Sequence, residues 1–313
     1  MTRPISNPPH VAARRRRRQG SSSLFRSALA LALVFTGGLA LLTARSLVPN
    51  SEAKSGVVPV QVPIGGLESS ACIGFGPSVG RSGPTVFIDP GHGGLDPGVV
   101  TVVEGRQVLE KHLTLAIANR LAALLRADGY RVVMSRTGDT SVAKLSANDS
   151  IAGALTASAV HRDLITRAAC ANGAKASVLV SIHFDAFDDS SVGGTETFYD
   201  AARPFASKSK RLAAALQSAV VGSVGSQDRG LFTDDQLAAP TLTPSASAYG
   251  HLIELGPALK GWVDSPSQMP GALIEPLFLT NPDEAKYASD PAGQQRIAVG
   301  IATGLKAYFA GSH

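Results

Sequence analysis

The sequence predicts an α/β fold: a largely parallel or mixed, twisted sheet with helices on both faces, in a single large domain. From Pro84 onward, short runs rich in β-branched residues alternate with longer amphipathic segments, which is the pattern of successive βα units. The chain has 313 residues, of which 44% are hydrophobic and 17% charged, so it can bury one sizeable core. It shows no internal repeat, which excludes a solenoid.

Five short runs predict the strands. The run TVFID fits a short buried strand, whereas the run GTETFYD alternates polar and apolar residues and predicts a strand with one face in water. The runs are 85–89 (TVFID), 130–136 (YRVVMSR), 177–183 (SVLVSIH), 194–200 (GTETFYD) and 272–276 (ALIEP).

Four segments have the apolar spacing of helices. In the first, Leu113, Ile117 and Leu121 fall on one face, and Asp128-Gly129 ends the segment. The predicted helices span 110–127, 161–171, 207–221 and a C-terminal segment marked by Ile297, Ile301, Leu305 and Tyr308.

Two long stretches interrupt this alternation. Residues 138–160 are small and polar, and residues from about 232 to 268 are rich in proline. Insertions of this length in a compact domain often form functional loops or lids, but they also occur as passive surface structure. Both interpretations stay open at this point.

The first 46 residues differ in charge from the rest. They carry eight arginines and no acidic residue, so subtracting 8 from the net charge of +5 leaves −3 for the remainder. Eighteen uncharged residues, 27–44, follow the arginines, as in a signal peptide or signal anchor. The predicted organisation is a basic cytoplasmic N-terminus (1–23), a signal peptide or signal anchor (24–46), a linker that could add a short strand (47–83) and a catalytic domain (84–313).

This layout predicts an exported protein of the periplasmic or cell-wall space, which stays attached to the membrane if the apolar segment is not cleaved. Nucleic acid is not an expected partner, because the positive charge ends where the apolar segment begins and aromatic residues make up only 5% of the chain. Cys72 and Cys170 are the only cysteines. In an oxidising compartment they could pair, or one could be buried and the other free.

Residues capable of metal chemistry follow the predicted strands. His92 comes three residues after TVFID, His183 ends SVLVSIH, Glu110 begins the first helix and Glu275 lies late in ALIEP. Since α/β sheets bind ligands beyond the carboxyl ends of their strands, these side chains should meet at one edge. Two histidines and a carboxylate can hold zinc with an open position for water, and a second carboxylate can act as general base. The glycines around His92 should leave open space for a substrate.

Several motifs in order resemble the amidase-3 type of zinc-dependent N-acetylmuramoyl-L-alanine amidase, a family of bacterial and phage cell-wall hydrolases. The resemblance runs from about Pro84 to Phe309. It rests on FIDPGHGGLDPG (87–98), EKHLTLAIA (110–118), SIHFDA (181–186), DRGLF (228–232), MPGALIEPLFLTNPDEA (269–285) and the C-terminal helix.

The resemblance implies that His92, Glu110 and His183 bind Zn²⁺ and that Glu275 is the catalytic residue. It implies hydrolysis of the amide that joins N-acetylmuramic acid to L-alanine of the peptidoglycan stem peptide. Two departures concern substrate contacts: Phe184-Asp185-Ala186 stands where the family usually has Ala-Asn-Ala, and Pro276 follows Glu275. A regulatory protein partner that displaces a covering insertion, and a monomeric state, are further expectations.

Other residues compete for these roles. Glu104 is a rival metal ligand in the loop before the first helix, and Glu254, in HLIELG, is a rival for the catalytic role, although a place on a strand or lid of the insertion is favoured. Asp185 could orient a substrate amide or a ligand imidazole, and Arg229 could contact a substrate carboxylate or fix a loop. His112 is expected on the helix surface, His161 in the first turn of its helix, and His251 in the insertion, where it could line the groove.

Three other functions fit parts of the pattern. A general zinc peptidase would use the same two histidines and glutamate. A wall-binding regulator without activity would not need all four residues. A phosphate-binding loop is disfavoured, because no Gly-Lys-[Ser/Thr] follows the glycines and the loop is acidic.

Overall fold

The computed structural model describes residues 58–80, 83–236 and 244–311. The predicted basic N-terminus and the signal or anchor segment lie outside these residues. Among the helices of the described ranges, none is both long and apolar enough to cross a membrane.

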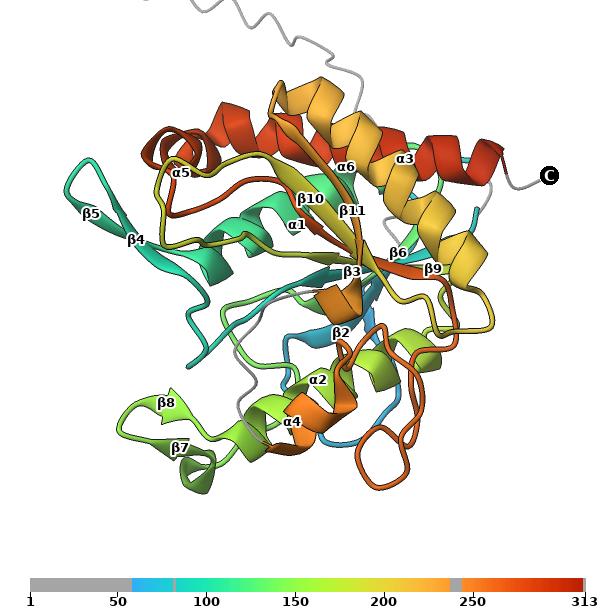
Figure 1. The fold of residues 1–313 in the computed structure, drawn as a ribbon. Helices are drawn as coiled ribbons and strands as arrows, with labels where there is room; N and C mark the ends of the chain where they lie inside the picture. The colour runs from blue at the N-terminus through green and yellow to red at the C-terminus, as the bar shows by residue number, and fades with distance from the viewer. Residues whose placement is uncertain (1–57, 81–82, 237–243, 312–313) are drawn as a thin grey trace, which may run out of the picture. The chain divides into compact units, whose positions relative to one another are not determined.

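One mixed sheet of eight strands organises the described residues (Figure 1). Its central strands β6, β3, β9 and β12 are parallel, whereas β10 runs antiparallel to β12 and parallel to β11. In spatial order the strands are β1 (Val60–Gln61), β2 (Ala71–Phe75), β6 (Arg131–Arg136), β3 (Thr85–Pro90), β9 (Val178–Ile182), β12 (Gly271–Glu275), β10 (Thr195–Tyr199) and β11 (Asp228–Thr233). The predicted α/β class is confirmed, and the sheet is mixed.

Helices cover both faces of this sheet, as predicted (Figure 1). One face carries α1 (Glu110–Ala127), α3 (Ala206–Val224), α5 (Pro282–Ser289) and α6 (Pro291–Ala310), and the other carries α2 (Ala157–Gly173) and the short α4 (Pro244–Tyr249). The bounds of α1 match the predicted helix. Helix α2 begins four residues before the predicted 161–171, because the Thr156 side chain accepts a hydrogen bond from the Ala159 N–H and caps the helix there.

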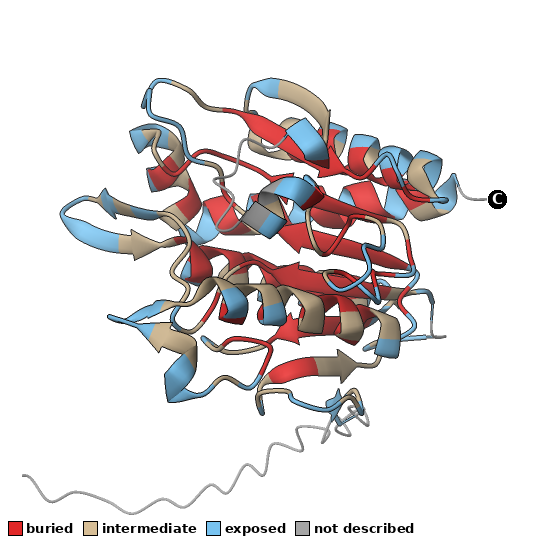
Figure 2. Ribbon diagram, turned by 60° about the horizontal axis from the view of Figure 1, so that its bottom comes forward, coloured by how far each residue is buried: buried red, intermediate tan, exposed pale blue. Residues whose placement is uncertain are grey.

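Alternate residues of the central strands point into two separate apolar layers, and the strands are buried on both sides (Figure 2). Val86 and Ile88 of β3 pack against the layer under α1, α3 and α6, whereas Phe87 packs into the layer under α2. The sheet is therefore held rigidly from both faces, and the loops at its edge start from fixed positions.

The prediction that residues 194–200 form a strand with one face in water is wrong, because all five residues of β10 are buried. The polar Thr197 is buried beneath α3, where its hydroxyl donates a 2.7 Å hydrogen bond to Gln217. The alternation of polar and apolar residues therefore reflects a buried polar pairing with a helix and not contact with water.

Segments expected to be irregular contribute structure. The 47–83 segment supplies β1 and β2, and Cys72 of β2 forms a disulfide with Cys170 of α2, with Cα atoms 5.7 Å apart. The loop between Gly98 and Glu110 is an antiparallel hairpin of β4 (Val100–Val103) and β5 (Arg106–Leu109).

The first insertion is partly built into the domain. Its residues Val142 and Ala143 are buried, and the Asp163 carboxylate of α2 accepts both of their backbone N–H groups at 2.7 Å. Further along, the insertion contains a small hairpin of β7 (Ser150–Ile151) and β8 (Ala154–Leu155), and its last residues belong to α2.

Candidate metal centre

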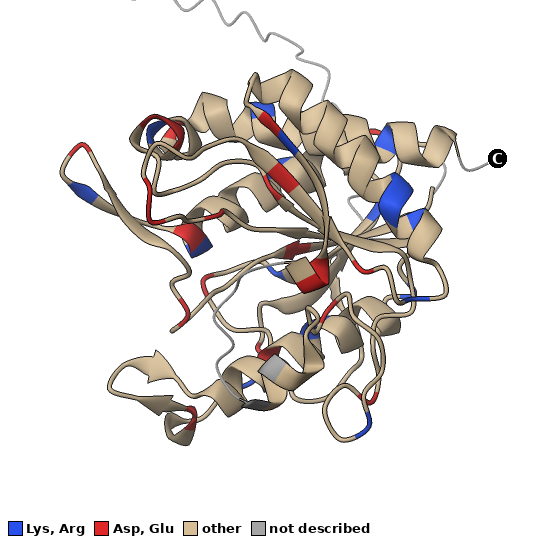
Figure 3. Ribbon diagram, in the orientation of Figure 1, with Lys and Arg blue, Asp and Glu red and all other residues tan. Residues whose placement is uncertain are grey.

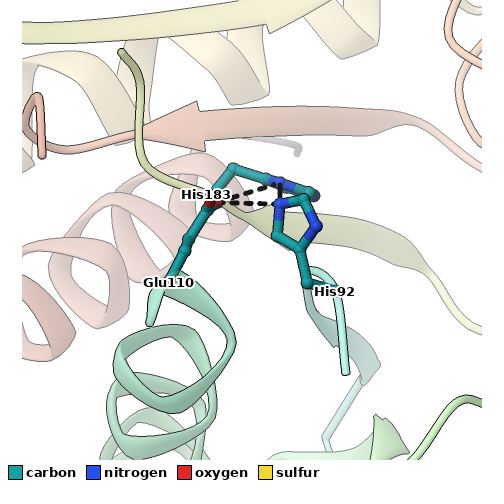
Figure 4. A group of neighbouring side chains, drawn as sticks. All are labelled: His92, Glu110 and His183. Atoms are coloured by element: carbon teal, nitrogen blue, oxygen red, sulfur yellow. Dashed lines mark hydrogen bonds and ion pairs between the residues drawn. The ribbon is translucent and has the colours of Figure 1, made fainter. Parts of the chain in front are cut away.

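Three predicted ligands come together at the carboxyl edge of the parallel strands (Figure 4). His92 lies two residues beyond β3, His183 directly follows β9 and Glu110 is the first residue of α1. The His92 Nε2 atom lies 3.1 Å from Glu110 Oε1 and 3.1 Å from His183 Nδ1, and His183 Nδ1 lies 3.3 Å from Glu110 Oε1. Two nitrogens and one oxygen therefore form a nearly equilateral triangle.

This triangle fits a tetrahedral metal ion. Metal–ligand bonds of about 2.0–2.1 Å place tetrahedral donor atoms roughly 3.3–3.4 Å apart, close to the separations found here. Both histidines are partly exposed, so a fourth position can face solvent. The donor set and the spacing match a metal centre with three protein ligands.

Glu110 is nearly fully buried and held by two backbone groups. Its Oε1 accepts a hydrogen bond from the Phe184 N–H and its Oε2 from the Val99 N–H, both at 2.8 Å. Burial by itself would raise the pKa of Glu110, but His92 and His183 hold it well below its usual range. The carboxylate is thus charged and fixed in orientation.

A second carboxylate orients His92. Asp96 Oδ2 lies 2.8 Å from His92 Nδ1, and Asp96 Oδ1 accepts the Gly98 N–H at 3.1 Å. Burial would lower the pKa of His92, but Glu110 and Asp96 raise it to about 10. Asp96 therefore fixes the ring so that Nε2 faces the other ligands, as carboxylates next to metal-binding histidines commonly do.

Two buried arginines hold the backbone of the His92 loop. Arg136 donates to the carbonyl oxygens of Pro90 (3.0 Å) and Gly91 (2.9 Å), and Arg167 donates to that of His92 (2.8 Å). Arg167 also pairs with the buried Asp89 at 2.8 Å. These contacts explain how His92 keeps a backbone φ of 63°, which is unfavourable for a residue with a Cβ atom.

Two glycines make room for the ligands themselves. A Cβ atom on Gly91 would lie 2.2 Å from the His183 ring, and one on Gly98 would lie 2.5 Å from Glu110 Oε2. The expectation that the glycines leave open space for a substrate is therefore wrong at these two positions, because His183 and Glu110 fill that space.

Glu275 ends β12 beside His183. The Ile274 carbonyl accepts the His183 N–H at 3.0 Å, and Glu275 pairs in register with Glu196 of β10. Burial, with Asp185 next in effect, raises the pKa of Glu275 well above its usual range. Its Oε2 atom is buried and has no hydrogen-bond partner among the described residues. A buried carboxyl group with an oxygen that has no hydrogen-bond partner among the described residues thus adjoins the His–Glu–His triangle.

Asp185 and Arg229 lie near Glu275. Carboxylate oxygens of Asp185, Glu196 and Glu275 all lie within 4.8 Å of one another. Arg229 pairs with Glu196 and stacks over the Phe278 ring, 5.0 Å from its centre. Arg229 therefore neutralises part of this acidic group and fixes the start of β11.

The rival residues lie elsewhere. Glu104 is exposed at the tip of the β4–β5 hairpin, where it pairs with Lys286 at 2.9 Å, so it does not join the triangle. Glu254 lies in a turn, not on a strand, and its buried side chain interacts with Asp89 beneath the sheet.

The remaining histidines do not join the triangle either. His112 is on the helix surface as expected, 3.2 Å from Asp139. His161 is the fifth residue of α2, past the first turn, because the helix starts earlier than predicted; its ring stacks on Trp262 at 3.8 Å. His251 contacts Asp200 and Asp234.

Three residues that support the site were not predicted from the sequence: Asp96, Arg136 and Arg167. Asp96 could have been found, because it lies four residues from His92 within the same loop. Arg136 and Arg167 carry no local signal, because their partners are backbone carbonyls about 45 and 75 residues away.

Charged residues of both signs are distributed over the described elements outside the site (Figure 3). In Figure 3, Lys and Arg are scattered among Asp and Glu over the elements in view, and they do not form a single basic stripe there.

A mixed α/β sheet with a His–Glu–His triangle at its carboxyl edge defines a class of α/β domains with a candidate metal centre. The family model described as N-acetylmuramoyl-L-alanine amidase, amidase-3, matches residues 86–307. The chain belongs to this family.

Relatives agree with this assignment. The chain is similar to the N-acetylmuramoyl-L-alanine amidase LytC of Bacillus subtilis (strain 168), with 32% identity over 227 residues, covering 72% of this chain and 36% of LytC. It is 31% identical over 251 residues to the amidase AmiC of Neisseria meningitidis, covering 74% of this chain and 55% of AmiC. The chain thus spans about a third to a half of the length of these two proteins.

Solved structures share the fold. An N-acetylmuramoyl-L-alanine amidase from Clostridium difficile 630 is 33% identical, with a TM-score of 0.52, and the match covers 74% of this chain and 98% of that one. The CwlD amidase from Clostridioides difficile, solved in complex with the GerS lipoprotein, is 26% identical with a TM-score of 0.56, covering 73% and 99%.

Proposed function

We propose that the chain is a zinc-dependent N-acetylmuramoyl-L-alanine amidase, which hydrolyses the amide between N-acetylmuramic acid and L-alanine of the peptidoglycan stem peptide. The observation that carries the proposal is the triangle of His92 Nε2, Glu110 Oε1 and His183 Nδ1 with the buried Glu275 carboxyl group beside it. His92, Glu110 and His183 would hold Zn²⁺, which polarises the scissile carbonyl and makes water more acidic.

Other groups of the chain orient the ligands and transfer the proton. Asp96 holds the His92 ring, and the Phe184 and Val99 N–H groups hold the Glu110 carboxylate, so the ligands need no rearrangement. The Glu275 carboxylate takes one proton from the attacking water as the C–O bond forms. It returns that proton to the amine nitrogen as the C–N bond breaks, which leaves a carboxylic acid and a free amine.

Burial suits Glu275 to this exchange. Its apolar surroundings and the neighbouring Asp185 increase its affinity for a proton, so that the proton is retained until the leaving amine needs it. A raised pKa makes the ionised Glu275 a stronger base toward water than an exposed carboxylate would be, which favours the first proton transfer.

The test is a matched pair of glutamate substitutions. Glu275→Gln should keep the zinc content of the wild type and lose turnover by a factor of about 10²–10⁴, measured by mass spectrometry of products from digested peptidoglycan. Glu254→Gln removes another buried glutamate with a raised pKa and should keep turnover. Undiminished turnover of Glu275→Gln would remove this residue from the role.

The substrate needs its own assay. Intact glycan-linked peptides should be cleaved to free stem peptides that begin with L-alanine. If isolated stem peptides are cleaved within their chains instead, the protein is a zinc peptidase and the proposed bond is wrong.

We also propose that the domain acts outside the cytoplasm. The Cys72–Cys170 disulfide supports this location, since such bonds persist in oxidising compartments. The uncharged segment 27–44 behind the arginines would direct export, and retention in the membrane would depend on whether it is cleaved.

A further inference from the structure

A second group of metal-binding side chains lies at the opposite edge of the sheet. Asp200 directly follows β10, Asp234 follows β11, and His251 lies in the second insertion. The His251 Nδ1 atom lies 2.9 Å from Asp200 Oδ2 and 3.3 Å from Asp234 Oδ1. All three donor atoms lie within 4.8 Å of one another. We call these three residues the Asp–Asp–His cluster.

The direction of β10 separates this cluster from the triangle at the other edge. Glu196 near the start of β10 pairs with Glu275, whereas Asp200 lies beyond the end of the same strand. Four residues of extended strand span about 13 Å. The cluster is therefore a different site from the candidate catalytic centre and shares none of its residues.

Two buried carboxyl groups share one imidazole in the cluster. Asp200 and Asp234 are 2% and 4% exposed, so both carboxylates are removed from water. The nearby Arg203 donates its guanidinium hydrogen bonds to the carbonyls of Gly256 and Ser267, and it forms no ion pair with either carboxylate in the described ranges. One imidazole faces two carboxylates, and unpaired buried charge is costly.

One oxygen of the cluster is without a hydrogen bond. Asp200 Oδ1 accepts the Ala202 N–H and Asp234 Oδ2 accepts the Leu252 N–H, so backbone groups fix the orientation of both carboxylates. Asp200 Oδ2 is buried, points into the cluster and accepts no hydrogen bond from the described residues. His251 Nδ1 lies 2.9 Å from this oxygen, but the two atoms do not have the geometry of a hydrogen bond.

We propose that the Asp–Asp–His cluster binds a divalent first-row metal ion, with Asp200 Oδ2, Asp234 Oδ1 and His251 Nδ1 as ligands. An imidazole nitrogen with two carboxylate oxygens is a donor set of zinc or manganese, whereas calcium and magnesium favour oxygen alone. The ion neutralises the two buried carboxylates. It also links the ends of β10 and β11 to the second insertion, so its role is structural.

The proposal is tested by counting metal ions on the full-length chain purified in detergent. Zinc is added, the excess is removed, and zinc per chain is measured by mass spectrometry, with circular dichroism to verify folding. Wild type should hold two ions. His251→Gln should hold one, His92→Ala/His183→Ala should hold one, and the triple variant should hold none.

A matched control and a second variant complete the design. His161→Gln removes a half-buried histidine that stacks on Trp262 outside the cluster, and it should still hold two ions. Asp200→Asn keeps the size of the side chain and should also hold one ion. In the His92→Ala/His183→Ala background, zinc or manganese should raise the melting temperature, and His251→Gln should abolish that rise.

Two results would overturn the proposal. If His92→Ala/His183→Ala binds neither zinc nor manganese, the cluster is not a metal site. If His251→Gln or Asp200→Asn still holds two ions, the second ion lies elsewhere. Neither result bears on hydrolysis, which is measured separately on peptidoglycan, so the two proposals can fail independently.

Discussion

Replacing Gly91 by alanine tests whether the backbone beside His92 must lack a side chain. Gly91 follows β3 directly, and its φ is outside the left-handed region, so alanine is compatible with the backbone there. The added Cβ atom would lie 2.2 Å from Cε1, 2.4 Å from Nε2 and 2.6 Å from Nδ1 of His183. The substitution therefore acts on one ligand ring, with no loss of polar contacts.

The size of the effect follows from these distances. Ordinary contact begins near 3.4 Å, so the His183 ring must move by about 1.2 Å. Metal–ligand distances tolerate changes of only about 0.2 Å, so the moved ring no longer binds in the same geometry. Since even loss of a supporting residue weakens metal binding 10–100-fold, Gly91→Ala should weaken it by at least about 100-fold, or roughly 3 kcal/mol. Crowding should also lower the free energy of unfolding by about 1–3 kcal/mol.

Zinc affinity of the folded protein is measured by competition with a chelator, alongside urea unfolding and amidase turnover. Gly65→Ala is the matched control, because a Cβ atom there meets nothing within 4 Å, and it should leave affinity unchanged. If Gly91→Ala binds zinc with an affinity within about threefold of wild type, zinc binding does not depend on the present position of the His183 ring.

Three further outcomes are expected. Asp96→Asn should weaken zinc binding about 10–100-fold in the chelator competition while the fold is kept, because the amide holds the imidazole less firmly than the carboxylate. Replacing Cys72 and Cys170 together by alanine should lower the free energy of unfolding in urea by about 4–5 kcal/mol, since the bond closes a loop of 98 residues; a loss below about 1 kcal/mol would contradict the loop argument. Glu254 has a raised pKa from burial and from Asp89, so its contribution to stability is complete below the pKa of the unfolded chain and is lost as pH rises. In Glu254→Gln, stability should fall less between about pH 5 and pH 8 than in wild type, and equal slopes in urea titrations would refute the assignment.

Local signals were enough to predict the central elements. The bounds of α1 agree with the prediction because its apolar spacing is regular and Asp128-Gly129 ends it. Strands β3 and β9 were found because their apolar residues are buried on both faces. By contrast, the segment with β1 and β2 was expected as a linker that could add one short strand, and the β4–β5 hairpin was expected as a loop. These residues become strands only through the partners they pair with.

The direction of β10 explains where the site prediction succeeded and where it stopped. His92 and His183 follow β3 and β9, and Glu275 ends β12. These three neighbouring strands are parallel, so the rule that parallel strands present their carboxyl ends at one edge was sufficient to predict that the side chains meet. That rule does not apply to β10, which is antiparallel, and strand direction leaves no trace in the residue pattern. Hence His251, which the sequence placed in the insertion, contacts Asp200 and Asp234 at the other end of the strand.

The two buried arginines show why a glycine-rich loop can still present a ligand accurately. Glycine loses the most backbone freedom on folding, so the Gly91–Gly94 region would be poorly fixed by its own preferences. Arg136 and Arg167 supply planar sets of N–H donors, and together they bind the carbonyl oxygens of three successive residues, 90 to 92. Asp89 and Asp163 hold Arg167 in turn, and Asp163 also binds the first insertion. Helix α2, strand β6 and the first insertion therefore fix the position of His92, and the glycines make room for the ligand side chains.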